Sequence, residues 1–269
     1  MSAVEALLAE YNSLNLHSIT DYDKFNQYAI THHSTVIEGA TLTENETRLL
    51  LEEGLTPKGK PLIHSLMVKD HYEALLFVIE RARQKTPLTL QLIKDINGKV
   101  MKNTGSIYNT PPGTVDASKG EFRKGNVSAG GYYFINFDKV PSYTEALVKK
   151  INENLNTVIT PLQQLELSFA AHFDLVTIHP FYDGNGRTSR LLMNYLQVLF
   201  ELPLAIVFKE DKSDYFTALQ TAREEETLEP FYTFMFGQYT RFLQQEIDLY
   251  KRQLQQKRPL KNGGLSLFF

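Results

Sequence analysis

Two apolar stripes of helical period flank one short polar segment, and this pairing limits the fold more than any other feature of the chain. Apolar residues recur at helical spacing over about 162–177, and a second such stripe begins after Arg190. Pro180, Gly184 and Gly186 lie between them and favour a tight turn. The stripes consist of Leu165, Phe169, Phe173 and Val176, then Leu191, Leu192, Tyr195, Leu196 and Leu199. The pattern predicts a helix-loop-helix whose loop leads directly into the second helix.

The segment from His179 to Arg190 reads His-Pro-Phe-Tyr-Asp-Gly-Asn-Gly-Arg-Thr-Ser-Arg and combines a base with an anion site. A helix N-terminus offers free N–H groups to an anion, and Asn185 can add a side-chain donor. Arg187 and Arg190 lie three apart on one helix face and can clamp phosphates. Asp183 is a hard oxygen ligand of the kind Mg²⁺ prefers, and His179 can take a proton near neutral pH. Together these groups indicate phosphate-transfer chemistry.

The same segment resembles the signature of the Fic family, His-Pro-Phe-x-(Asp/Glu)-Gly-Asn-Gly-Arg-x-x-Arg, at every specified position. The resemblance implies an all-α Fic fold, with a helical core and a small β-hairpin flap beside the active site. It implies transfer of AMP from ATP to a Tyr, Thr or Ser hydroxyl of a target protein, with release of pyrophosphate. It further implies that His179 is the general base, that Phe181 anchors the loop and that Asp183 holds Mg²⁺. The ATP-binding residues implied are Gly184, Asn185, Gly186, Arg187 and Arg190.

An upstream segment, Ser34-Thr35-Val36-Ile37-Glu38-Gly39, resembles the (Ser/Thr)-x-x-x-Glu-(Gly/Asn) inhibitory motif of many Fic proteins. Helical spacing predicts a helix over about 21–38, which places Ser34 and Glu38 on one face and ends at Gly39. The resemblance implies that Glu38 pairs with Arg190 and so keeps ATP from binding productively. The N-terminal position of this motif is that of the class II Fic proteins.

A Gly- and aromatic-rich stretch at 126–136 predicts a hairpin, because its residues alternate and its glycines permit a turn. It follows a Gly-x-Phe-Arg sequence at Gly120–Arg123, which often introduces the flap of Fic proteins. The resemblance implies that the target docks on this flap by strand addition. The residues expected to contact the target are Val127, Ser128, Ala129 and Gly130.

The composition limits which kinds of partner and which cellular location we expect for the chain. The chain has 269 residues, is 42% hydrophobic and 22% charged, carries a net charge of −3 and contains no cysteine. This balance argues against a nucleic-acid partner, and no apolar run is long enough to span a membrane. The start of the chain lacks the features of a secretory signal. We therefore expect a cytoplasmic location and neither disulfides nor thiolate chemistry.

We expect one Fic-type domain over 1–256, with the inhibitory helix near 21–38 and the catalytic core over about 90–240. Helical spacing predicts further helices along the chain, and Thr43 and Glu46 predict a capping box. Residues 103–112 are predicted to be a loop. The tail, 257–269, is expected to be flexible or to dock its phenylalanines on a neighbouring molecule.

The sequence thus predicts an autoinhibited protein adenylyltransferase that uses ATP and Mg²⁺. Self-modification and a homo-oligomer remain open. So do three other functions: transfer of phosphocholine or phosphate, removal of AMP with Glu38 as the base, and non-catalytic binding of a nucleotide or partner. The intact Gly-Asn-Gly-Arg segment favours AMP over phosphate, and the intact His179 argues against a pure binder.

Overall fold

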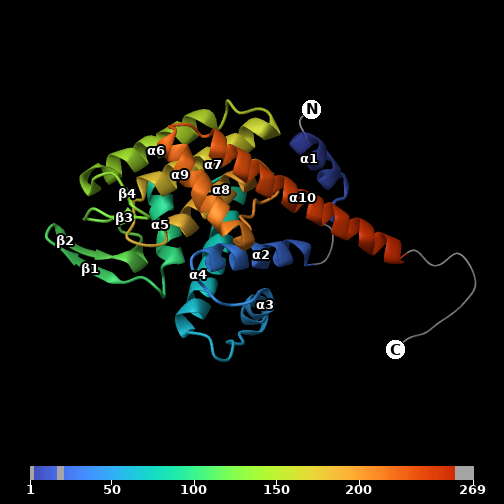
Figure 1. The fold of residues 1–269 in the computed structure, drawn as a ribbon, viewed down its shortest axis with the longest axis horizontal. Coiled ribbons are helices and arrows are strands. Elements are labelled where there is room, and N and C mark those ends of the chain that lie inside the picture. Colours follow the sequence, from blue (N-terminus) through green and yellow to red (C-terminus); the bar gives the residue numbers. More distant parts are fainter. Residues whose placement is uncertain (1–2, 17–20, 258–269) are drawn as a thin grey trace, which may run out of the picture.

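A computed structural model describes residues 3–16 and 21–257 of the chain, and within them the fold is all-α with two small antiparallel hairpins (Figure 1). The helices are α1 (Ala3–Ser13), α2 (Tyr22–Ile37), α3 (Glu44–Glu53), α4 (Leu62–Arg83), α5 (Leu90–Val100), α6 (Val140–Asn154), α7 (Pro161–Ile178), α8 (Asn185–Leu199), α9 (Lys212–Glu224) and α10 (Glu229–Lys257). The strands are β1 (Ile107–Thr110), β2 (Gly113–Asp116), β3 (Ser128–Ala129) and β4 (Tyr132–Tyr133). The predicted fold class is confirmed.

The two helices predicted from the apolar stripes, α7 and α8, form the centre of the molecule. They pack on each other, α4 and α5 cover α8, and α6 lies along α7 (Figure 1). The contact is apolar: Leu165, Phe169, Leu191, Leu192 and Leu196 are all fully buried. Burial of this kind contributes about 1.5–3 kcal/mol for each large side chain, so the helix pair is a firm base for the loop between its members.

Local sequence signals set where several helices begin. Thr43 and Glu46 form the predicted capping box at the start of α3. A second capping box, formed by Thr160 and Gln163, starts α7, and Pro161 occupies the first turn, where its missing N–H costs nothing. These caps satisfy N–H groups that the helix itself leaves free.

Helix α2 packs on α4 and ends beside the central helix pair. Gly39 follows its last residues with φ +101°, a left-handed value that an L side chain rarely adopts. The N–H groups of Gly39 and Ala40 return to the carbonyls of Val36 and Thr35. This C-terminal turn fixes the direction in which Glu38 leaves the helix.

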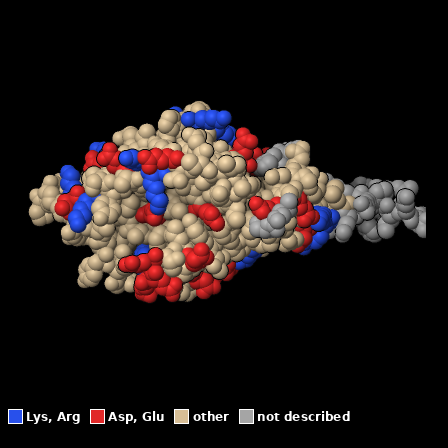
Figure 2. Space-filling model, turned by 90° about the horizontal axis from the view of Figure 1, so that it is seen from above, with Lys and Arg blue, Asp and Glu red and all other residues tan. Residues whose placement is uncertain are grey.

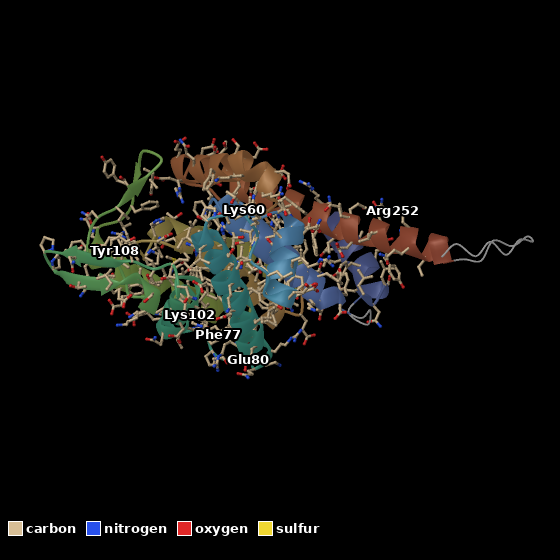
Figure 3. All side chains as sticks on the ribbon, turned by 90° about the horizontal axis from the view of Figure 1, so that it is seen from below. Lys60, Phe77, Glu80, Lys102, Tyr108 and Arg252 are labelled. Atoms are coloured by element: carbon tan, nitrogen blue, oxygen red, sulfur yellow. The ribbon has the colours of Figure 1, made fainter. Side chains whose placement is uncertain are left out.

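The sequence predicts a loop over 103–112, but within it Ile107–Thr110 form β1, which pairs with β2 (Gly113–Asp116) in a hairpin. Side chains on one face of this hairpin are buried and those on the other are exposed: Val115 is fully buried, whereas Ile107 is exposed. Pro111 and Pro112, between the paired residues Thr110 and Gly113, form the tip of this hairpin. Tyr108 lies near the end of the molecule opposite Arg252 (Figure 3). The predicted flap is confirmed as a hairpin, with β3 and β4 joined at Gly130 and Gly131.

The described surface carries mixed charges. Figure 2 shows Lys and Arg interspersed with Asp and Glu on one face, without a continuous basic band among the coloured residues. Among residues 3–16 and 21–257, no helix combines the length and apolarity needed to cross a bilayer. From residue 258 on, the predicted tail lies outside the described residues.

Candidate active site

The loop between α7 and α8 is held in one shape by its own side chains. His179 ends α7 in the left-handed region, with φ 52°. The carboxamide of Asn185 accepts a hydrogen bond from the N–H of Phe181 (3.0 Å) and donates to the carbonyl of the same residue (2.9 Å). The Phe181 ring is buried, as expected for an anchor. Because the amide of Asn185 is occupied in this way, its contribution to an anion site is its backbone N–H.

The imidazole of His179 is stacked against the flap. The ring of Phe134 lies 3.8 Å from it, centroid to centroid, at an interplanar angle of 18°. Nδ1 lies 3.3 Å from the carbonyl of Val176, a contact that leaves Nε2 as the acceptor when Nδ1 carries the proton. Burial, chiefly, and the positive charges of Arg123 and Arg223 lower the pKa of His179 to about 4. The ring is therefore neutral at pH 7, as a base must be.

Arg123 joins the flap to the loop between α7 and α8. Its Nε donates to the carbonyl of His179 (2.8 Å), Nη1 to the carbonyl of Gly125 (2.9 Å) and Nη2 to that of Ile135 (2.5 Å). Its N–H donates to the carbonyl of Pro180 (3.0 Å). This side chain is almost fully buried and contacts both ends of the flap. The Gly-x-Phe-Arg sequence signalled the flap, but the sequence did not show that its arginine sets the backbone of His179.

The start of α8 forms a site for an anion. Its first N–H groups have no partner within the helix. Arg187, buried beneath them, donates from Nη2 to Asp183 Oδ1 (3.2 Å), while its Nε and Nη1 have no partner among the described residues. Buried guanidinium donors are rarely left unpaired, so this arrangement is suited to receiving a ligand's oxygens.

Glu38 occupies part of this anion site. Its Oε1 accepts from Nη2 of Arg190 at 2.7 Å, and Arg190 also donates from Nε to the hydroxyl of Ser34 (2.8 Å). A Cβ built on Gly186 would lie 2.5 Å from the same carboxylate oxygen. Burial alone would raise the pKa of Glu38, but the guanidiniums of Arg190 and Arg187 outweigh it and hold that pKa below its usual value. An ionised carboxylate thus lies against the first turn of α8.

A cavity of about 490 Å³ opens beside His179, between the flap and α9. Its lining is aromatic and aliphatic, with a few polar groups at the edge. The lining residues include Tyr132, Phe134, Val176, Phe216, Leu219 and Arg223. A cavity of this size and lining suits a planar organic group.

Gly184 starts α8 in a position where no side chain fits. Its φ is +77°, and an added Cβ would lie 2.8 Å from Sδ of Met101 and 2.9 Å from Nδ2 of Asn97. We expect Gly184→Ala to lower the free energy of unfolding by about 2–4 kcal/mol, from backbone strain and overpacking together. Urea denaturation measures this loss. Gly54→Ala is the matched control, because Gly54 has φ +72° and open space around it, so it should lose only about 1–2 kcal/mol. Equal losses would contradict the close-packing account.

The structure brings together the predicted residues from two distant parts of the chain. The loop between α7 and α8, the start of α8 and the end of α2 meet at one place, and the flap lies beside it. Three contributors were not found from the sequence: Phe134, which stacks on His179; Arg223, which lies under the flap; and Tyr215, whose hydroxyl lies 3.5 Å from Nη1 of Arg190. Only the apolar and aromatic content of their segments could have indicated them.

Comparisons with known proteins agree with this geometry. The model of the Fic/DOC family matches residues 87–197. The "Protein adenylyltransferase Fic" of Drosophila erecta is 32% identical over 205 residues, which make up 76% of this chain and 38% of that protein. Its counterpart in Drosophila melanogaster is 30% identical over 204 residues, again 76% of this chain and 39% of the relative. The chain therefore spans well under half the length of these relatives.

Solved structures show the same architecture. A Fic domain containing signaling protein from Bacteroides thetaiotaomicron has a TM-score of 0.80 and 25% identity, covering 93% of this chain and 98% of that one. Fic-1 (residues 134–508) from C. elegans has a TM-score of 0.73 and 25% identity, covering 93% and 72%. Fold and site define an all-α protein in which one loop joins a base to an anion-binding helix start. The chain belongs to the Fic family.

Proposed function

We propose that this chain is a protein adenylyltransferase that moves AMP from ATP to a hydroxyl side chain of a target protein and is inhibited by its own Glu38. One observation carries the proposal: the carboxylate of Glu38, at the end of α2, lies 2.7 Å from the guanidinium of Arg190 on α8. This contact lies at the start of α8, which would receive phosphate and which directly follows the loop that begins at His179. Relatives named as protein adenylyltransferases support the same reaction.

The phosphates of ATP would bind at the start of α8. Its N–H groups at Asn185 and Gly186 and the unpaired donors of Arg187 supply the contacts, and Arg190 would add a second guanidinium once Glu38 withdraws. The adenine would enter the cavity between the flap and α9, where aromatic side chains can stack on it.

The residues present fit a magnesium ion that arrives with the nucleotide. Asp183 has a half-exposed carboxylate, whose Oδ1 accepts from Arg187 while Oδ2 accepts no hydrogen bond from the described residues. Within those residues no group of three or more His, Asp or Glu side chains could hold a metal alone. One carboxylate with phosphate and water ligands is a common arrangement for Mg²⁺. Bound there, the ion would supply charge neutralisation at the phosphates.

The target would dock on the flap as an added strand, along Val127, Ser128, Ala129 and Gly130. Its hydroxyl would then face Nε2 of His179. The hydroxyl oxygen attacks the α-phosphorus, the bond from that phosphorus to the bridging oxygen breaks, and pyrophosphate leaves. The imidazole takes the hydroxyl proton, while Arg187 and Arg190 offset the charge on the leaving phosphates.

Mass spectrometry of the acceptor provides a direct test. Glu38→Gly protein is incubated with ATP and Mg²⁺ in a cell lysate, and modified peptides are sequenced. The proposal expects an AMP group on Tyr, Thr or Ser of a target or of the chain itself, whereas a phosphate or phosphocholine adduct, or no adduct, would contradict it. A modified residue in this chain would also establish self-modification.

A second candidate is removal of AMP, and the position of Glu38 favours it. Its carboxylate oxygen lies against Gly186 in the first turn of α8, so it could orient a water molecule at the same phosphorus. Wild-type protein given an AMP-modified target would then release AMP, and Glu38→Gln would not. Release by both proteins would remove Glu38 from that role.

A further inference from the structure

Arg223 lies beneath the flap in an unusual setting for an arginine. Its guanidinium carbon is 5.0 Å from the ring centroid of Tyr132, 5.8 Å from that of Phe134 and 6.0 Å from that of Phe173. Nε donates to the hydroxyl of Thr177 at 3.2 Å. No carboxylate pairs with Arg223 among the described residues. Planar guanidiniums stack well on aromatic faces, so this side chain is a clamp between α9, α7 and the flap.

The contacts of Arg223 continue through Phe134 to His179. Phe134, which Arg223 contacts, is the ring stacked on His179, and Tyr132 meets Phe134 edge-on with centroids 5.2 Å apart. The N–H of Phe134 donates to the carbonyl of Val127, so the same residue also sets the flap backbone (3.2 Å). A continuous set of contacts therefore joins Thr177 on α7, Arg223 on α9, the flap and the imidazole.

We propose that Arg223 is a positioning residue: it seats Tyr132 and Phe134 of the flap and through Phe134 fixes the imidazole of His179. The inference rests on the proposed function, since it assigns His179 and the flap their parts in AMP transfer. Arg223 would act through Phe134 and would not itself touch the reacting atoms.

The cavities on either side support this position. Arg223 and Tyr132 line both the cavity beside His179 and a second one of about 280 Å³, which faces Asp174 and Thr227. Arg123 holds the two ends of the flap, whereas Arg223 lies against the rings of Tyr132 and Phe134, between these two cavities. Without the guanidinium, the two aromatic rings could move into either cavity, and the flap edge would lose its register with the base.

The charges around His179 give a measurable consequence. Arg123, from the segment before the flap, and Arg223, from α9, disfavour the imidazolium, while Glu38, at the end of α2, favours it. Burial under Phe134 acts in the same direction as the two arginines. Loss of Arg223 removes a positive charge and loosens the covering ring, so both effects raise the pKa of His179.

The test compares Arg223→Gln and Arg223→Lys in the Glu38→Gly background. The matched control is Arg81→Gln, because Arg81 also lies 5.0 Å over a ring, that of Phe77, but on α4 away from the flap (Figure 3 labels Phe77). We expect Arg223→Gln to lower kcat/KM for the target about tenfold, mostly through KM. The acidic limb of its pH–rate profile should move to higher pH. Arg223→Lys keeps the charge and should restore most of the pH position but not the KM.

The outcomes separate a failed inference from a failed function. An unchanged target KM and pH profile in both Arg223 variants, with Arg81→Gln also unchanged, would overturn the inference and leave AMP transfer intact. If the Glu38→Gly background transfers no AMP, the function fails, and NMR titration of His179 still decides the inference. Its resonance is assigned by its absence in His179→Ala. Loss of charge alone raises the pKa of His179 in Arg223→Gln, so the deciding readout is the chemical shift of the imidazole protons, which the stacked ring of Phe134 influences. A changed shift in both Arg223→Gln and Arg223→Lys supports the positioning role, and an unchanged shift in both contradicts it.

Discussion

Replacing His179 by alanine is expected to lower AMP transfer by about 100- to 10,000-fold, measured in the Glu38→Gly background. The reason is geometric: Nε2 is the neutral acceptor that the stacked ring offers to the target hydroxyl, and Nδ1 is engaged by Val176. ATP binding should survive, because the phosphate contacts come from the start of α8. Isothermal titration with ATP and Mg²⁺ checks this second part.

The control for this variant is His64→Ala, since His64 lies on α4 and bonds to Thr41. It should transfer AMP at the background rate. Loss of ATP binding in His179→Ala would mean that the residue holds the loop together and is not a base. The pH dependence gives a further check. Burial lowers the pKa of His179 to about 4 in the wild type, and removal of Glu38, which raises that pKa, lowers it further. The rate in the Glu38→Gly background should therefore not fall until the pH drops to about 4 or below.

Glu38→Gly is expected to raise AMP transfer by about 10- to 100-fold over the wild type. The carboxylate makes a charge-assisted bond to Arg190, a contact that typically contributes about 1.5–3 kcal/mol, and it lies where a phosphate oxygen would bind. Removing it frees the guanidinium and an anion position together. Initial rates of labelling at a fixed ATP concentration measure the gain.

Two graded variants at the same position sharpen this test. Glu38→Gln keeps the shape without the charge, and Glu38→Asp keeps the charge with a shorter reach. Both should lie between wild type and Glu38→Gly. If Glu38→Gln matches the wild type, the inhibition is steric and the charge is incidental; if Glu38→Gly itself shows no gain, Glu38 is not the inhibitor.

The contact between Glu38 and Arg190 was predictable although the two residues are 152 positions apart. The helical period placed Ser34 and Glu38 on one face, and the two motif resemblances supplied the partner. The helices α7 and α8 followed from their apolar stripes for a similar reason: periodicity reports which face is buried, and burial decides helix packing.

Other parts of the site could not be predicted from the sequence, because they depend on which residues of separate elements come into contact in the folded chain. Nothing local indicates that Arg123 contacts three carbonyls or that Arg223 lies under three rings, since each partner comes from another element. The hairpin at 107–116 was missed because the segment 103–112 is rich in Thr, Asn and Pro, which favour a loop, and each strand has only four residues. Asn185 was expected to face an anion, but its carboxamide pairs with Phe181 through an exchange of two hydrogen bonds.

The most direct test of autoinhibited AMP transfer is labelling with ATP that carries radioactivity either at the α- or at the γ-phosphate. Wild type, Glu38→Gly and Glu38→Gly/His179→Ala are each incubated with Mg²⁺ and a cell lysate. The account predicts protein-bound α-label that is strong in Glu38→Gly, weak in wild type and lost in the double variant, while γ-label, which kinases of the lysate also produce, is the same with all three proteins. γ-label that rises with Glu38→Gly and is lost in the double variant, or equal α-label in all three proteins, would contradict it.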